Sequence, residues 1–239
     1  GWQNHMDAVF DRYGVTAAEM LELMSGFELA LRPVYQELHT WARSDLGNRY
    51  LVAPPELIPA HWLPSPLGDD WRALAVVENG DVEPALQAMG AKKMVQGVED
   101  WFVGTGLAPL PTAFWERSNL FPVPPGARVG KTQGSSTWDL NLSGDVRVLM
   151  SAKPTAAWMS AATRELAFAH AYHLRAEGRL YSPIRQQGPD AVVAALGVWS
   201  DLATTRPAHL VQAGLLDAPS AEMPTLLGEA LTYVTFVQF

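Results

Sequence analysis

The segment from Thr155 to Glu177 constrains the fold of this chain more than any other part of its sequence. It is rich in alanine and holds neither glycine nor proline, and Pro154 directly precedes it. Alanine has the highest intrinsic helix propensity, and proline is tolerated at a helix start but not in its interior. We therefore predict one long helix over these residues.

Apolar periodicity and capping signals predict further helices. Thr16-Ala17-Ala18-Glu19 has the spacing of a capping box, and an apolar run follows it. Pro33 either kinks this helix or begins a new one. An amphipathic helix is expected over Ala91–Gly104. Shorter helices are expected at 83–89 and 207–213, each followed by a glycine.

The one clear β signal lies between Ser136 and Met150. A turn composition at 141–145 separates two stretches with strand character, which is typical of a β-hairpin. The proline-rich stretch at 49–70 is expected to be an extended connection, and the stretch at 107–130 is again rich in proline. The predicted fold class is therefore mostly α, with one small β-hairpin.

Charge and composition exclude several classes of function. The net charge of −8 at pH 7 argues against nucleic acid and against an anionic membrane surface as partners. No apolar run reaches the roughly 18 residues that a membrane-spanning helix needs. The absence of cysteine excludes disulfides, thiol nucleophiles and Cys-based metal sites. With no signal peptide recognised, we expect a cytoplasmic protein.

The length of 239 residues suits a single domain. Gly1-Trp2-Gln3-Asn4-His5 precedes Met6 and is interpreted as a cloning remnant. One mainly helical domain is therefore expected over residues 6–239.

Several short segments carry a family resemblance. They are LRPVYQELH at 31–39, PAHWL at 59–63, GLAPLP at 106–111 with FW at 114–115, STWDL at 136–140, and PAHL at 207–210 with GLLD at 214–217. In this order and spacing the chain resembles the angiotensin-converting-enzyme family of zinc dipeptidyl carboxypeptidases. The resemblance implies a degenerate and truncated member, a helical fragment of the zincin-like (gluzincin) angiotensin-converting-enzyme fold.

The resemblance also shows where this chain departs from the family. Two histidines of the family motif, four residues apart on one helix, bind zinc, and a glutamate beside the first is the general base. These positions fall on Arg164, Phe168 and Glu165, so only the glutamate is kept. Neither a guanidinium nor a phenyl ring offers a lone pair to a metal. The family's third ligand, a glutamate, falls on Ala194 or Ala195, depending on where the count starts.

Other positions of the family site are also replaced. A substrate-contacting histidine falls on Gly134, and an aspartate near the metal falls on Val198. Peptide hydrolysis by this family needs the metal to polarise the carbonyl and to activate water. The sequence therefore predicts no metal, no other cofactor and no zinc peptidase activity. The remnant cleft is expected to be lined by Glu165, Arg164, Phe168, Trp138, Asp139, Gly134 and Ala194.

Two roles are open for each charged candidate. Glu165 is either a general acid or base in a partly buried cleft or a member of a structural ion pair, and the ion pair is preferred. Arg164 either binds a ligand carboxylate or fills the vacated metal position and pairs with Glu165, and the second is preferred. Asp139 is interpreted as a turn residue, and His170 and His173 as structural histidines.

Three functions follow from these interpretations. The first is a catalytically inactive pseudoenzyme that binds a small molecule or protein partner in the remnant cleft. The second is a repurposed metal-free biosynthetic enzyme of cyclase or isomerase type, in which Glu165 exchanges protons with a small apolar metabolite. The third is an interaction subunit or homodimer, since loss of the family's lid helices would expose apolar surface.

Overall fold

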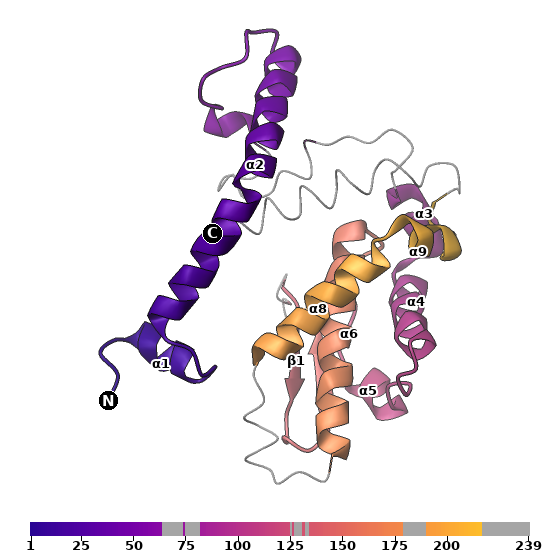
Figure 1. Ribbon diagram of the computed structural model, residues 1–239. Helices are drawn as coiled ribbons and strands as arrows, with labels where there is room; N and C mark the ends of the chain where they lie inside the picture. Colours follow the sequence, from indigo (N-terminus) through magenta and orange to yellow (C-terminus); the bar gives the residue numbers. More distant parts are fainter. Residues whose placement is uncertain are drawn as a thin grey trace. The chain divides into compact units, whose positions relative to one another are not determined.

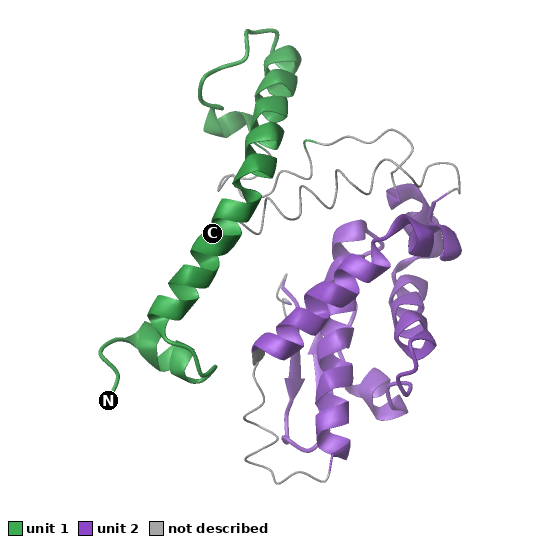
Figure 2. Cartoon of the chain, viewed as in Figure 1, with its two compact units in different colours: residues 1–79, 222–239 green, residues 80–221 purple. Residues whose placement is uncertain are grey.

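The computed structural model describes residues 1–63, 74, 82–124, 126, 131, 134–178 and 190–216. The chain divides into two compact units, residues 1–79 with 222–239 and residues 80–221 (Figure 2). The single domain expected over residues 6–239 stays a prediction.

The first unit is built on one long helix. Its elements are α1 (His5–Asp11), α2 (Ala17–Arg49) and the short 3-10 helix η1 (Ala60–Trp62) (Figure 1). The predicted capping box opens α2, because Thr16 Oγ1 accepts from the Glu19 amide and the Glu19 carboxylate accepts from the Thr16 amide. The helix continues through Pro33, so no new helix begins there.

Only the second half of α2 packs against a core. Leu38, Ala42, Leu46 and Leu74 are its buried apolar residues, and Tyr35, Trp41, Ile58, Trp62 and Leu63 pack around them. Every residue from 21 to 30 is exposed. The first half of this helix therefore presents an open apolar surface within its unit.

The second unit holds the other elements. They are α3 (Glu83–Met89), α4 (Ala91–Gly104), α5 (Thr112–Arg117), β1 (Ser136–Asp139), β2 (Val146–Leu149), α6 (Ala156–Glu177), α8 (Asp190–Thr204) and α9 (Pro207–Gln212). Helix α6 is central, and α4, α8 and both strands contact it (Figure 1). The predicted fold class, mostly α with one hairpin, is confirmed.

The core of this unit lies between α4, α6 and the hairpin. Phe102, Phe114, Met150 and Leu166 are at most 2% exposed. Alanines at 162, 167 and 169 are fully buried on α6. Their small side chains let neighbouring elements approach the helix closely. This explains how the alanine-rich α6 can lie at the centre of the unit.

The hairpin pairs its two strands in antiparallel register, with Ser136 opposite Leu149 and Asp139 opposite Val146. Gly144 in the turn has φ of +103°, a conformation that favours glycine. Its Cα faces Ala176 of α6 so closely that an added Cβ would lie 3.1 Å from the Ala176 Cβ. The tip of the hairpin therefore rests on the last turns of α6.

Within the part of the chain that the structure describes, none of the helices has the length and apolar character needed to cross a bilayer. The cytoplasmic location stays a prediction.

Candidate functional site

Helix α6 carries three of the candidate residues in its middle. The Thr155 side chain caps its first turn by accepting from the Trp158 amide at 3.3 Å. Arg164, Glu165 and Phe168 follow two to three turns later. Because successive helical residues are about 100° apart, Glu165 leaves α6 in another direction than Arg164 and Phe168, which are four residues apart and share a face.

Glu165 points toward strand β1. The residue is only 7% exposed. The Thr137 hydroxyl donates to Glu165 Oε2 at 2.5 Å and lies 3.1 Å from the Glu165 backbone oxygen. Thr137 was not predicted from sequence, although it is the neighbour of Trp138. Strand alternation is the signal that singles it out, since it places residues 137 and 138 on opposite faces.

Arg164 points toward α8. Its Nε lies 3.5 Å from Asp201 Oδ2, and its Nη2 donates to Ser160 Oγ at 3.3 Å. Ser160 Oγ in turn donates to Asp201 Oδ2 at 2.6 Å. The preferred pairing of Arg164 with Glu165 is therefore wrong. Adjacent helical residues do not face each other, whereas Asp201 on the neighbouring helix is within reach.

Phe168 also packs on α8. A Cβ added at Gly197 would lie 3.3 Å from Phe168 Cε1 and 3.6 Å from Arg164 Cγ. The phenyl ring and the aliphatic part of the arginine thus occupy the space next to this glycine. At the two positions where the resemblance places zinc ligands, the Phe168 ring and the aliphatic part of Arg164 pack beside Gly197 of α8.

The third zinc position of the resemblance falls on Ala194 or Ala195, and neither side chain can bind a metal. Ala194 and Ala195 both lie exposed on α8, and so does Val198. Among the residues that the structure describes, no three His, Asp or Glu side chains gather closely enough to hold a metal ion. A guanidinium, a phenyl ring and a methyl group do not fit zinc.

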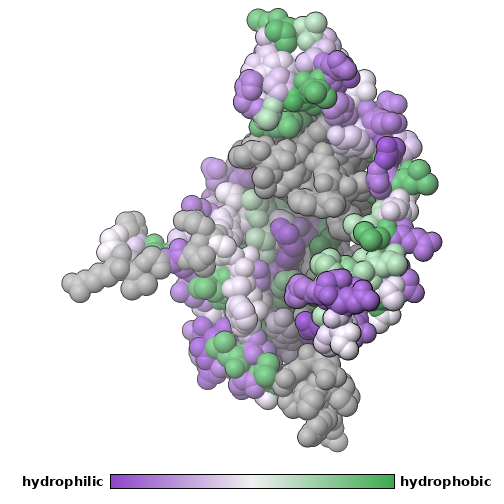
Figure 3. All heavy atoms as spheres, turned by 90° about the vertical axis from the view of Figure 1, so that its left-hand side faces the viewer, coloured by the Kyte–Doolittle hydropathy of each residue, from purple (hydrophilic) through white to green (hydrophobic). Residues whose placement is uncertain are grey.

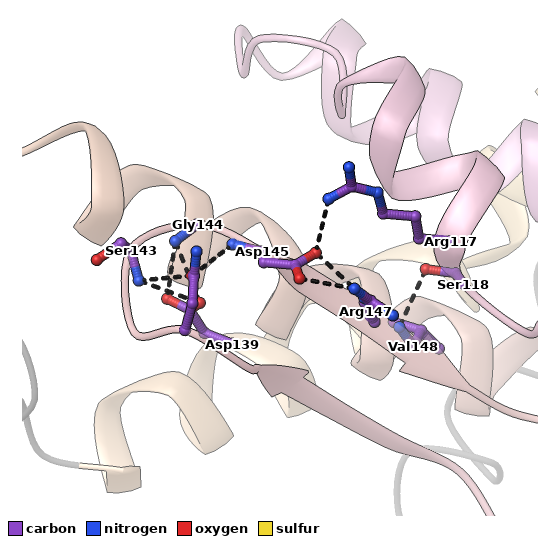
Figure 4. A network of polar contacts seen from close by, with 9 residues as sticks. Arg117, Ser118, Asp139, Ser143, Gly144, Asp145, Arg147 and Val148 are labelled. Atoms are coloured by element: carbon purple, nitrogen blue, oxygen red, sulfur yellow. Dashed lines mark hydrogen bonds and ion pairs between the residues drawn. The ribbon is translucent and has the colours of Figure 1, made fainter.

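Trp138 and Asp139 follow Thr137 at the end of β1. Neither of them has the hydrogen bond to Glu165 that Thr137 makes. Trp138 is 62% exposed on the strand face opposite to Thr137. Asp139 Oδ1 accepts from the amides of Ser143 and Gly144 at 3.2 and 3.1 Å, so it ties the turn together (Figure 4). This agrees with its interpretation as a turn residue. Gly134 lies exposed just before the strand.

A second polar cluster stabilises the hairpin. Asp145 pairs with Arg147 at 2.7 Å and with Arg117 of α5 at 3.2 Å (Figure 4). The hydrogen bond from Arg147, helped by Arg117, holds the pKa of Asp145 below its usual value. This cluster ties the turn of the hairpin and strand β2 to α5.

The two histidines of α6 have different surroundings. His170 is 3% exposed, and its Nε2 lies 2.9 Å from Glu99 Oε2, while Glu99 Oε1 accepts from the Leu110 amide at 2.7 Å. This buried pair links α4 to α6 and supports the structural interpretation of His170. His173 Nε2 is buried without a hydrogen-bond partner among the described residues. Burial lowers the pKa of His173, and the nearby Glu177 opposes that shift.

The chain is similar in sequence to known proteins. The sequence profile of the family described as "Angiotensin-converting enzyme" matches residues 1–239. The angiotensin-converting enzyme of Bos taurus is 30% identical over 228 residues that cover 87% of this chain. Those of Mesocricetus auratus and Rattus norvegicus are 29% and 28% identical over the same share. The chain spans 17% of the length of each of these relatives.

Proposed function

This chain belongs to the angiotensin-converting-enzyme family, and on that premise we propose that it is a metal-free homologue that binds a ligand around Glu165 and does not hydrolyse peptides. The replaced zinc positions carry this proposal. Arg164 and Phe168 stand where the family resemblance places two histidine ligands, and both pack against α8. A peptidase of this kind needs a metal to activate water, and one glutamate alone does not lower the pKa of water.

Binding around Glu165 is supported by the way this residue is held. The residue is nearly buried, with 7% of its surface exposed, and the Thr137 hydroxyl orients its carboxylate. Arg164, with 48% of its side chain exposed, lies one residue away. A carboxylate that is oriented by a neighbouring strand and keeps some exposed surface is suited to recognise a polar group of a ligand. We call Arg164, Glu165, Phe168 and Thr137 the remnant site.

Two measurements test this proposal together. The purified protein, with zinc added, is assayed against peptides with a free carboxyl terminus, and no hydrolysis is expected. A small-molecule library is then screened by thermal shift with the wild type and the Glu165→Gln variant. Hits are expected to lose their effect in Glu165→Gln and to keep it in Glu116→Gln, a matched change at an exposed glutamate of α5. Peptide hydrolysis that depends on zinc would refute the proposal.

Metal-free acid–base catalysis at Glu165 is the second candidate. The observation in its favour is the short contact with Thr137, which fixes one carboxylate oxygen and leaves the other, Oε1, with no hydrogen bond to any described residue. Such a group suits proton exchange with a small apolar metabolite. In this case Glu165→Gln abolishes turnover of an identified ligand while binding persists. Equal turnover by both proteins would exclude it.

Self-association or a protein partner is the third candidate. Figure 3 shows green hydrophobic residues exposed among purple hydrophilic ones on the face drawn. The first half of α2 exposes several large apolar residues, Leu21, Leu23, Met24, Phe27 and Leu29. Exposed apolar residues at this density are typical of surfaces that another protein covers. Light scattering that gives the mass of one chain, 26.1 kDa, would exclude a stable homodimer.

A further inference from the structure

The carboxylate of Glu165 has no cation beside it in the part of the chain that the structure describes. Its side-chain hydrogen bond comes from the Thr137 hydroxyl, which is neutral. None of the ion pairs between described residues includes Glu165. Placing an ionised carboxylate in a site that is 7% exposed costs free energy unless a positive charge compensates it.

The nearest arginine does not supply that charge. Arg164 is the next residue along the helix, but its guanidinium is directed toward Asp201 and Ser160 on the α8 side. Asp201 carries one negative charge and offsets the single positive charge of Arg164. Among the described residues, Arg164 therefore has an acidic partner, whereas the Glu165 carboxylate has no cationic one.

The rest of the chain reinforces this bias. The net charge is −8 at pH 7, so the electrostatic field of the protein attracts cations and repels anions. A ligand carboxylate at Arg164 would have to compete with Asp201, which already lies at 3.5 Å. The Arg164–Asp201 pair and the net negative charge thus disfavour the anionic ligand that an exposed arginine by itself suggests.

We propose that the remnant site selects an organic cation, and that a ligand ammonium group pairs with Glu165 Oε1 while Thr137 holds Oε2. This inference rests on the proposed ligand-binding function and names the chemical class of the ligand. Thr137 is a positioning residue in this arrangement, because it fixes the carboxylate that receives the ammonium group. No covalent step is involved.

Two probes of matched size test the proposal. Phenethylammonium and 3-phenylpropionate share a phenyl ring and a short chain but carry opposite charges at pH 7. Calorimetric titration of the full chain is expected to give a dissociation constant about tenfold or more lower for the ammonium probe. Glu165→Gln is expected to remove this preference, and Glu116→Gln is expected to keep it.

A second measurement needs no variant that might misfold. The side-chain carboxyl carbons of ¹³C-glutamate-labelled protein are followed by NMR during titration with each probe. The Glu165 resonance is expected to shift with phenethylammonium and to stay in place with 3-phenylpropionate.

The possible results distinguish a failure of the cation preference from a failure of the proposed ligand binding. Glu165-dependent binding of 3-phenylpropionate, as tight as that of the ammonium probe, would overturn the cation preference and leave the ligand-binding function standing. A phenethylammonium effect that survives in Glu165→Gln would overturn the inference as well. A library screen without any Glu165-dependent hit would remove the ligand-binding function itself.

Discussion

The buried pair of Glu99 and His170 allows a prediction whose magnitude follows from the hydrogen bonds. Glu99 accepts from two donors, the Leu110 amide at 2.7 Å and His170 Nε2 at 2.9 Å, and both side chains of the pair are 4% exposed. Glu99→Leu removes both acceptors and leaves two buried donors without partners. Each orphaned donor costs about 1–3 kcal/mol, so the substitution is expected to destabilise the protein by about 2–6 kcal/mol.

The double variant Glu99→Leu/His170→Leu leaves only the Leu110 amide without a partner. Its cost is expected to be about 1–3 kcal/mol, so His170→Leu should restore stability when Glu99 is already leucine. Urea unfolding followed by circular dichroism and tryptophan fluorescence measures the three variants and the wild type. If His170→Leu destabilises the Glu99→Leu background as much as it destabilises the wild type, the two residues are not coupled and the reasoning fails.

Three further predictions concern α6 and its neighbours. Gly197→Val should destabilise the protein by about 1–3 kcal/mol, because the new side chain meets Phe168. Gly97→Ala on α4 meets nothing within 4 Å and should stabilise the protein by up to about 1 kcal/mol. The urea midpoints of the two variants are compared with that of the wild type. Because burial lowers the pKa of His173, the unfolded chain takes up the proton first as the pH falls below about 6.5, and the fold loses stability there. His173→Leu should lessen that acid loss, seen as a smaller shift of the urea midpoint between about pH 7.5 and 5.5. Asp145→Asn should speed amide hydrogen exchange at Leu140, whose amide donates to the Asp145 backbone oxygen at 3.0 Å, since it weakens the pairing with Arg147.

Each of these has a clear contrary result. Equal stability changes for Gly197→Val and Gly97→Ala would mean that α6 and α8 are not closely packed at Phe168. An unchanged acid loss in His173→Leu would place the responsible group elsewhere. Unchanged exchange at Leu140 in Asp145→Asn would show that the arginine pair does not stabilise the turn.

Most of the fold follows from local signals in the sequence. The capping box at Thr16, the apolar stripe of Ala91–Gly104 and the alanine-rich segment of α6 each depend on residues a few positions apart. The turn composition at 141–145 likewise sets the hairpin without help from distant residues. Short-range rules therefore suffice to predict these elements. Pro33 was less decisive, since the sequence left open whether a new helix begins there.

The candidate site depends on contacts between residues far apart in sequence. Thr137 reaches Glu165 across 28 positions, and Arg164 lies by Asp201 only because α8 packs on α6. The sequence favoured an Arg164–Glu165 pair because the two are neighbours, but helix geometry turns adjacent side chains apart. Glu99 and His170 are 71 positions apart, and no local pattern connects them. Which of these residues contact each other is therefore determined by tertiary packing.

The most direct test of the central claim is the metal content of the purified protein. Elemental analysis, followed by calorimetric titration with zinc, asks whether the chain holds a metal at the positions where the family resemblance places the ligands, namely Arg164, Phe168 and Ala194 or Ala195. With these residues in place, we expect no stoichiometric zinc and no titratable site. One zinc per chain, bound with an affinity that falls when His173 or Glu165 is substituted, would contradict it.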